Sequence, residues 1–203
     1  CTNERNCESQ LIEKIKHFIS RDAMNIEGLG EKQIESFFKK GILNSISDIY
    51  NLYRFRENLT NEKGYGEKSI RNLLNSIENS KNNYLDKFIF GLGIRYVGKK
   101  TSKILASNFN SIREIIDNFD ETIDQYGTDK ILEIDQIGEK SLRELKVYFS
   151  NKFNINLINN LLQYLNPRPL EKKEAEGKLL GKKIVFTGTL NTISRSEAKN
   201  IAE

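Results

Sequence analysis

Several residue types are scarce in this sequence, and each shortage argues against a class of function. The 203 residues hold no tryptophan, one histidine and two cysteines, and no apolar run approaches the roughly 18 residues of a membrane span. Because His17 has no evident nucleophile or second ligand beside it, we expect a surface or packing residue there, and neither a catalytic triad nor a metal site. No signal-peptide pattern is present, so we expect a cytoplasmic protein without a membrane partner.

An excess of one charge is also lacking. Lysine and arginine number 32 against 28 aspartates and glutamates, which gives a net charge of +4. With 37% hydrophobic and 30% charged residues, the chain is long enough for one helical core and a smaller piece. The overall charge therefore does not establish a nucleic-acid partner, and only the placement of particular lysines can do so.

A short glycine pattern, by contrast, occurs four times. Each copy ends in a glycine that is followed two residues later by a lysine, and these glycines are Gly30, Gly66, Gly98 and Gly138. The copies stand about 30 to 40 residues apart, which is the size of one supersecondary unit used repeatedly.

Apolar residues follow each of these glycines at the spacing of a buried helix face. They are Ile34, Phe37 and Phe38, then Ile70, Leu73, Leu74 and Ile77, then Leu105, Ala106 and Phe109, and finally Leu142, Leu145 and Phe149. A helical pattern also precedes most of the glycines, as in residues 11–19 and 84–89. Each unit is therefore predicted to be a helix, a tight glycine hairpin and a second helix, and the fold class mainly α with four tandem units.

The glycines and lysines together favour anion binding at the hairpins. A short link between helices often needs a residue at positive φ, and glycine also leaves N–H groups bare at the positive end of the second helix, a concavity suited to one phosphate. A lysine in the first helical turn is unfavourable for the helix itself, which points to an anion outside. The candidate phosphate-binding residues are Gly28, Gly30, Lys32, Gly64, Gly66, Lys68, Arg95, Gly98, Lys99, Lys100, Gly138 and Lys140.

The alternative is a bundle of helical hairpins in which glycine stops helices and lysine is a solvated charge. Four copies in register favour phosphate binding over that alternative, and the pattern resembles the helix-hairpin-helix motif of DNA-binding proteins without sequence specificity. In the third and fourth copies Tyr96 and Gln136 replace the first glycine. These two hairpins are expected to hold phosphate less well, or only to pack.

The two ends of the chain differ from the repeats. Three interpretations of Cys1 and Cys7 are open. They are half of a tetrahedral four-cysteine zinc site, or two free thiols, or Cys1 is a lipidated N-terminal cysteine. Residues 166–178 contain two prolines and a charged run without an apolar face, which predicts a linker. Residues 181–190 then predict a short buried strand that ends in a turn, and a capping box at 194–197 begins a helix.

The order of these parts resembles bacterial NAD-dependent DNA ligase. The most specific segment is residues 17–24, which with Ile26 and the Gly28-Leu29-Gly30 hairpin looks like the start of the helix-hairpin-helix domain of that family. The resemblance implies that residues 1–10 end a four-cysteine zinc finger with Cys1 and Cys7 as ligands. Residues 11–165 would form the DNA-binding domain, 166–178 the linker, and 179–203 a truncated α/β BRCT start.

The family seals nicks in duplex DNA during replication and repair, passing adenylate from NAD to a lysine and then to the 5'-phosphate. The sequence holds no Lys-x-Asp-Gly, so NAD, magnesium and every catalytic residue are expected upstream. The resemblance implies nicked duplex DNA as the partner, a monomer, and a place in the bacterial nucleoid. The alternatives are a non-catalytic junction-binding or repair module, and a scaffold that binds proteins through the BRCT piece.

Overall fold

The computed structural model describes residues 8–60, 66–119, 131, 134, 136–171, 185 and 194. The chain divides into two compact units, residues 1–170 and residues 171–203. Nearly all of the second unit, and with it the expected BRCT start, lies outside the described residues.

The described part of the first unit is helical, which confirms the mainly α prediction. Its helices are α1 (Glu8–Ile19), α2 (Glu31–Lys39), the 3₁₀ helix η1 (Ile46–Phe55), α3 (Arg56–Thr60), α4 (Glu67–Ser80), α5 (Leu85–Gly91), α6 (Lys99–Asn108), α7 (Ile112–Asp117), α9 (Glu139–Phe149) and α10 (Lys152–Leu162). The described residues contain no β-strand, only one isolated parallel bridge between Tyr84 and Arg168. None of these helices has the length and apolar character that crossing a bilayer requires.

The second helix of each repeat begins where the sequence predicts it. α2, α4, α6 and α9 all start at the residue after the repeated glycine. The predicted stripe is largely buried, including Ile34, Phe37, Ile70, Leu73, Leu105 and Leu145. Each such side chain stabilises the fold by about 1.5–3 kcal/mol relative to exposure, so packing rather than helix propensity holds these short helices.

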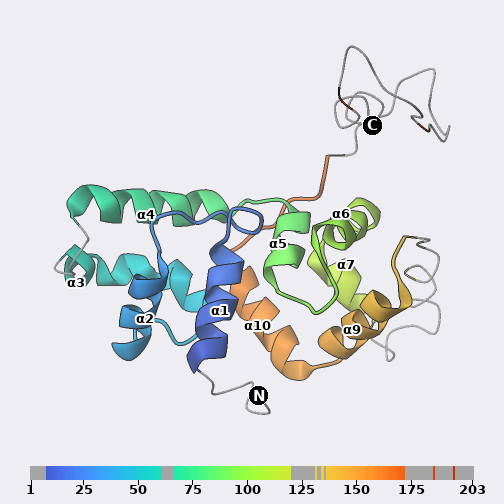
Figure 1. Cartoon of the computed structure of the whole chain (residues 1–203), viewed down its shortest axis with the longest axis horizontal. Coiled ribbons are helices and arrows are strands. Elements are labelled where there is room, and N and C mark those ends of the chain that lie inside the picture. The colour runs from blue at the N-terminus through green and yellow to red at the C-terminus, as the bar shows by residue number, and fades with distance from the viewer. Residues whose placement is uncertain are drawn as a thin grey trace. The chain divides into compact units, whose positions relative to one another are not determined.

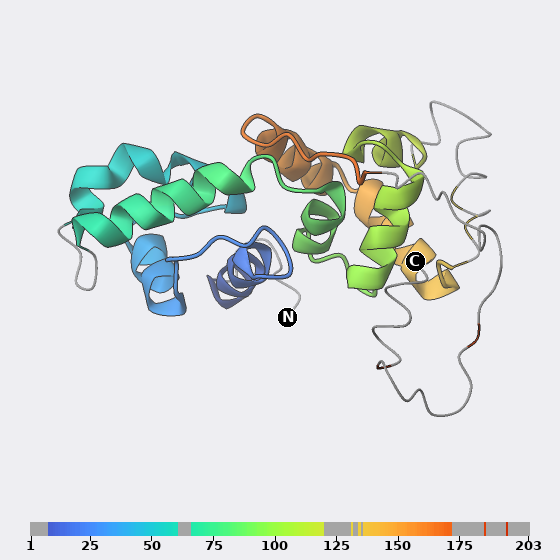
Figure 2. The ribbon, with the colours of Figure 1, turned by 90° about the horizontal axis from the view of Figure 1, so that it is seen from above.

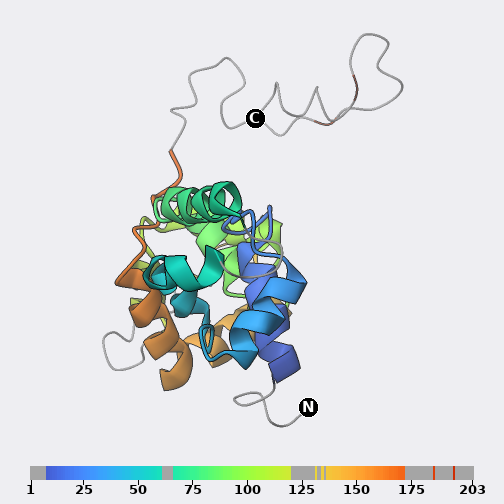
Figure 3. The same cartoon turned by 90° about the vertical axis from the view of Figure 1, so that its left-hand side faces the viewer.

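The helices of the first two repeats and those of the last two form two groups (Figures 1 and 2). α2, η1, α3 and α4 make the first group, and α5, α6, α7 and α9 make the second, with α1 and α10 between them. α1 contacts α2, η1 and α5, and α10 contacts both η1 and α9. Seen end-on, α1 and α2 lie on one side of the unit and α10 on the other (Figure 3). The repeats thus share one core.

Two linking elements begin with a side-chain cap. Ser45 and Asp48 form a reciprocal capping box at the start of η1. Ser111 caps α7 by accepting a hydrogen bond of 3.1 Å from the Glu114 N–H. η1 is a 3₁₀ helix rather than an α-helix, a distinction that apolar spacing does not make.

The chain returns to the core after α10. Asn166 N–H donates to the Lys81 carbonyl at 2.8 Å, Arg168 N–H to the Asn83 carbonyl at 2.9 Å, and Leu85 N–H to the Arg168 carbonyl at 2.7 Å. Residues 166–170, expected at the beginning of the linker, therefore run alongside the link between α4 and α5.

Candidate nucleic-acid interface

Four helices of the repeats begin in the same way. Gly30, Gly66, Gly98 and Gly138 are their N-caps, with φ between −68° and −104° and extended ψ values, and no described side chain caps any of the four. The first N–H groups of an α-helix have no partner inside the helix. Each helix start therefore presents backbone N–H donors and the positive end of the helix dipole, which together can bind one phosphate group.

Three of these glycines leave open space in front of the helix. A Cβ added at Gly66, Gly98 or Gly138 would meet no heavy atom within 4 Å, whereas at Gly30 it would lie 2.7 Å from Gln33 Oε1. All four glycines are exposed. A ligand can therefore approach the backbone closely at these points.

The positive φ expected of the hairpins lies at the position of the first glycine. Gly28 has φ +88°, and its backbone faces α4, where an added Cβ would lie 3.3 Å from Leu73 Cβ. In the third hairpin Tyr96 occupies the corresponding position with φ +60°. Gly30, Gly66, Gly98 and Gly138, the second glycine of each hairpin, have negative φ, so the expectation of positive φ is wrong for them. The role that remains for them is to leave the backbone accessible to a ligand.

The candidate cations are placed around these helix starts. Lys32, Lys68, Lys100 and Lys140 are the second residues of α2, α4, α6 and α9, and all four are exposed. The Arg95 guanidinium lies over the Tyr96 ring, 5.0 Å from its centroid. The third hairpin carries the most positive charge, because the first turn of α6 has no acidic residue while α2, α4 and α9 begin with Glu31, Glu67 and Glu139.

Two ion pairs tie the hairpins to neighbouring elements. Lys99 Nζ pairs with the Asp22 carboxylate in the turn after α1, and this hydrogen bond lowers the pKa of Asp22 below its ordinary value. Lys16 Nζ lies 2.7 Å from Glu13 Oε1 and 2.8 Å from Glu31 Oε1, and the hydrogen bonds to Glu13 and Glu31 raise the pKa of Lys16. Lys99 is thus shared between a protein carboxylate and any phosphate at α6.

Serines of the following unit fix the two odd-numbered hairpins. Ser76 Oγ in α4 accepts from the Glu27 N–H at 2.8 Å and donates to the Asn25 carbonyl at 3.4 Å. Ser141 Oγ in α9 donates to the Tyr96 carbonyl at 2.8 Å. Hairpin one is therefore positioned by unit two, and hairpin three by unit four.

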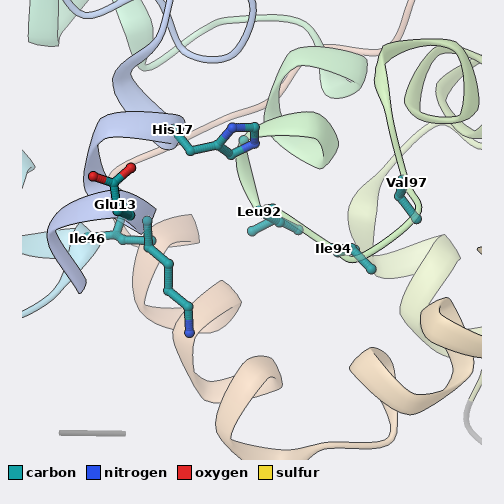
Figure 4. Close-up of a pocket in the computed structure, with 9 residues that line it drawn as sticks. Glu13, His17, Ile46, Leu92, Ile94 and Val97 are labelled. Carbon is teal, nitrogen blue, oxygen red and sulfur yellow. The ribbon is translucent and has the colours of Figure 1, made fainter. Parts of the chain in front are cut away.

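His17 packs between the first and third units, as the sequence predicts for a lone histidine. Its Nε2 lies 2.7 Å from the Phe90 carbonyl, and its ring meets the Phe90 ring edge-on at 4.7 Å. It lines a pocket of about 400 Å³ between α1 and the third hairpin, with Glu13, Ile46, Leu92, Ile94 and Val97 (Figure 4). The described residues hold no cluster of three or more histidine, cysteine, aspartate or glutamate side chains that could bind a metal.

Some of the sequence predictions fall outside the described residues. Gly64 of the second hairpin and the expected zinc ligands Cys1 and Cys7 belong to this set. Conversely, sequence reasoning missed Asp22, Ser76 and Ser141, which position the hairpins, and it treated Tyr96 only as a departure. A serine on a helix surface gives no signal of this kind, since its partner is a backbone group in another repeat.

Comparison with known proteins agrees with this geometry. Residues 87–158, which include the third and fourth hairpins, match the family model described as a helix-hairpin-helix motif. Over 100% of its length the chain is 43% identical to a DNA ligase of Ehrlichia canis (strain Jake), 41% identical to one of Rickettsia bellii (strain OSU 85-389) and 39% identical to one of Bacillus pumilus (strain SAFR-032). The chain spans 30% of the length of each of these relatives.

Proposed function

The chain belongs to the DNA ligase family as a segment about 30% as long as its relatives, and on this premise we propose that it is the part that grips DNA. It holds the phosphate backbone of nicked duplex DNA without reading the sequence. The observation that carries this proposal is the set of four glycine-capped helix starts, each exposed and each followed by an exposed lysine. Backbone N–H groups and lysines contact phosphates, which carry no sequence information.

Four hairpins are part of this proposal, although the four are not alike. The third and fourth lie within residues 87–158, which match the helix-hairpin-helix family model. In the first hairpin, residues 20–30 connect α1 to α2, and this link is longer than a tight turn. In the first hairpin the link gains its support from α4. We therefore assign a phosphate to each of α2, α4, α6 and α9.

In the whole enzyme, this segment serves an NAD-dependent ligase that acts in replication and repair. Because the segment lacks Lys-x-Asp-Gly, the adenylation site, with NAD and magnesium, belongs upstream. Residues 179–203 begin a BRCT domain, and the protein works as a monomer on chromosomal DNA in the cytoplasm. Incubating the 203-residue chain with labelled NAD should give no covalent adenylate.

The N-terminal cysteines are assigned to a structural zinc site. Cys1 and Cys7 supply two thiolates, which is half of the tetrahedral set that zinc prefers. A chain extended upstream should bind one zinc ion per molecule through four sulfur atoms at about 2.3 Å, and replacing Cys7 with serine should release it. An extended chain without a further cysteine pair would rule the site out.

The test of DNA binding is a titration of nicked duplexes of two unrelated sequences. We expect equal affinities, and a clear loss when Lys32 and Lys68 are both changed to glutamine. The matched control changes Lys14, in the middle of α1, and Lys39, the last residue of α2, to glutamine, because both are exposed and the pair removes the same charge. A strong preference for one sequence, or equal losses in both double variants, would contradict the proposal.

A further inference from the structure

The third hairpin contains a bulky residue in a conformation that favours glycine. The turn from Ile94 to Val97 is closed by the Val97 N–H, which donates to the Ile94 carbonyl at 3.0 Å, and Tyr96 is its third residue with φ +60°. Gly28 occupies that position in the first hairpin. A side chain at positive φ crowds its own backbone, so an aromatic residue there is an outlier that needs a compensating role.

Core packing does not supply that role. Tyr96 is 51% exposed, whereas its neighbours Ile94 and Val97 are only 4% and 5% exposed. Ser141 holds the Tyr96 carbonyl, which fixes the backbone of the turn and leaves the ring facing solvent. A glycine at this position would allow the same turn and leave the neighbouring residues buried, so the fold does not require the tyrosine ring.

The surroundings of the ring point to DNA. Arg95 lies over one of its faces, and two residues after Tyr96 the bare Gly98 caps α6, which begins with Lys99 and Lys100. A phosphate held at the start of α6 would bring its own sugar next to the ring. Deoxyriboses line the walls of the minor groove, where proteins without sequence specificity place apolar and aromatic side chains.

We propose that Tyr96, supported by Arg95, is a minor-groove contact residue of the third hairpin. Its ring packs against the sugar and base edges beside the phosphate at α6, and it adds a contribution that does not depend on counterion release. This inference rests on the proposed function and deepens it, because it assigns a DNA contact to Tyr96, the residue that replaces the first glycine in the third hairpin.

The test compares Tyr96→Gly and Tyr96→Asn with the wild type in the 203-residue chain. Both replacements accept positive φ, so thermal stability should not fall. By analogy with aromatic stacking on bases, DNA affinity should fall by about 5- to 10-fold at every salt concentration. The slope of log affinity against log salt should stay unchanged, and Tyr96→Phe should retain most of the affinity.

Tyr53 provides a matched control. It is 57% exposed and lies beside Arg54, whose guanidinium is 5.7 Å from the ring centroid, but it is on η1 and not on a hairpin. Tyr53→Ala should bind DNA as the wild type does. Wild-type affinity in both Tyr96 variants, or an affinity loss with a reduced salt slope, would overturn the inference while the proposed function stands. A wild-type chain that does not bind DNA would overturn both.

Discussion

The glycines at the starts of α4 and α6 have backbone angles that most residues adopt. Gly66 has φ −104° and Gly98 has φ −88°, and an added Cβ at either would meet nothing within 4 Å. Glycine is therefore not needed there for the turn or for packing. What it provides is a backbone that a ligand can reach.

Gly66→Ala and Gly98→Ala should separate ligand approach from stability. We expect weaker DNA binding, because the methyl group stands where the phosphate approaches. The free energy of unfolding should change by less than about 1 kcal/mol, the size of an N-cap preference. Thermal unfolding and DNA titration of each variant check both expectations.

Gly41→Ala is the control with the opposite pattern. Gly41 has φ +68° and open surroundings at the end of α2, so alanine should cost about 1 kcal/mol through backbone strain and leave DNA affinity unchanged. If Gly66→Ala and Gly98→Ala bind DNA as the wild type does, bare backbone is not what the ligand uses.

A second residue-scale prediction concerns the carboxylate that shares Lys99. Asp22→Asn should increase DNA affinity at low salt, because it removes both a competitor for Lys99 and a negative charge beside α6. The lowered pKa keeps Asp22 ionised at neutral pH, so its ion pair is lost only as pH falls through that lowered value. Glu78→Gln, which removes the ion-pair partner of Lys81 at the end of α4, is the control and should have no such effect.

At the scale of elements, each odd-numbered hairpin depends on a helix of the next repeat. Ser76 is the link between α4 and the first hairpin, and Ser141 is the link between α9 and the third. Each of these bonds therefore joins a hairpin to the repeat that follows it.

Ser76→Ala should loosen the first hairpin without unfolding the helices. Losing the bond should cost about 1 kcal/mol, and amide exchange at Glu27 should accelerate, since its N–H would lose its acceptor. Hydrogen exchange followed by NMR measures this directly. Ser69→Ala, at an exposed site in the first turn of the same helix, should leave exchange at Glu27 unaffected, and an unchanged rate in Ser76→Ala would contradict the assignment.

The elements that the sequence predicts best are those with a strong local signal. The starts of α2, α4, α6 and α9 follow from glycine and the apolar stripe. The left-handed Tyr96 could not be predicted, because tyrosine disfavours that conformation and only the register with Gly28 suggests it. The ion pair of Asp22 with Lys99 joins distant residues that no local pattern connects.

In the whole helical unit, the first and third repeats pack against each other through α1 and α5 and share one hydrophobic core. Phe18 of α1 lies against Gly91 of α5, where an added Cβ would be 3.2 Å from Phe18 Cδ2, and His17 binds the Phe90 carbonyl. Such close approach of two helices requires a residue without a side chain. The sequence shows Gly91, but it does not predict that Phe18 packs against it.

Gly91→Val should therefore destabilise the unit by about 1–3 kcal/mol through overpacking. The measurement is denaturant unfolding of the 203-residue chain, with Gly98→Val as the control at a site where an added Cβ meets nothing within 4 Å. Equal stability of Gly91→Val and wild type would show that the contact between α1 and α5 is loose.

If these hairpins hold DNA through its phosphates, the affinity must depend strongly on salt concentration. Affinity of the 203-residue chain for one nicked duplex, measured over a range of salt concentrations, should fall with a log-log slope of about −0.9 for each phosphate contacted. Changing Lys32, Lys68 or Lys100 singly to glutamine should reduce the slope by about one unit, while changing Lys39 should not. An affinity that is independent of salt, or a slope unaffected by all three hairpin lysines, would contradict the account.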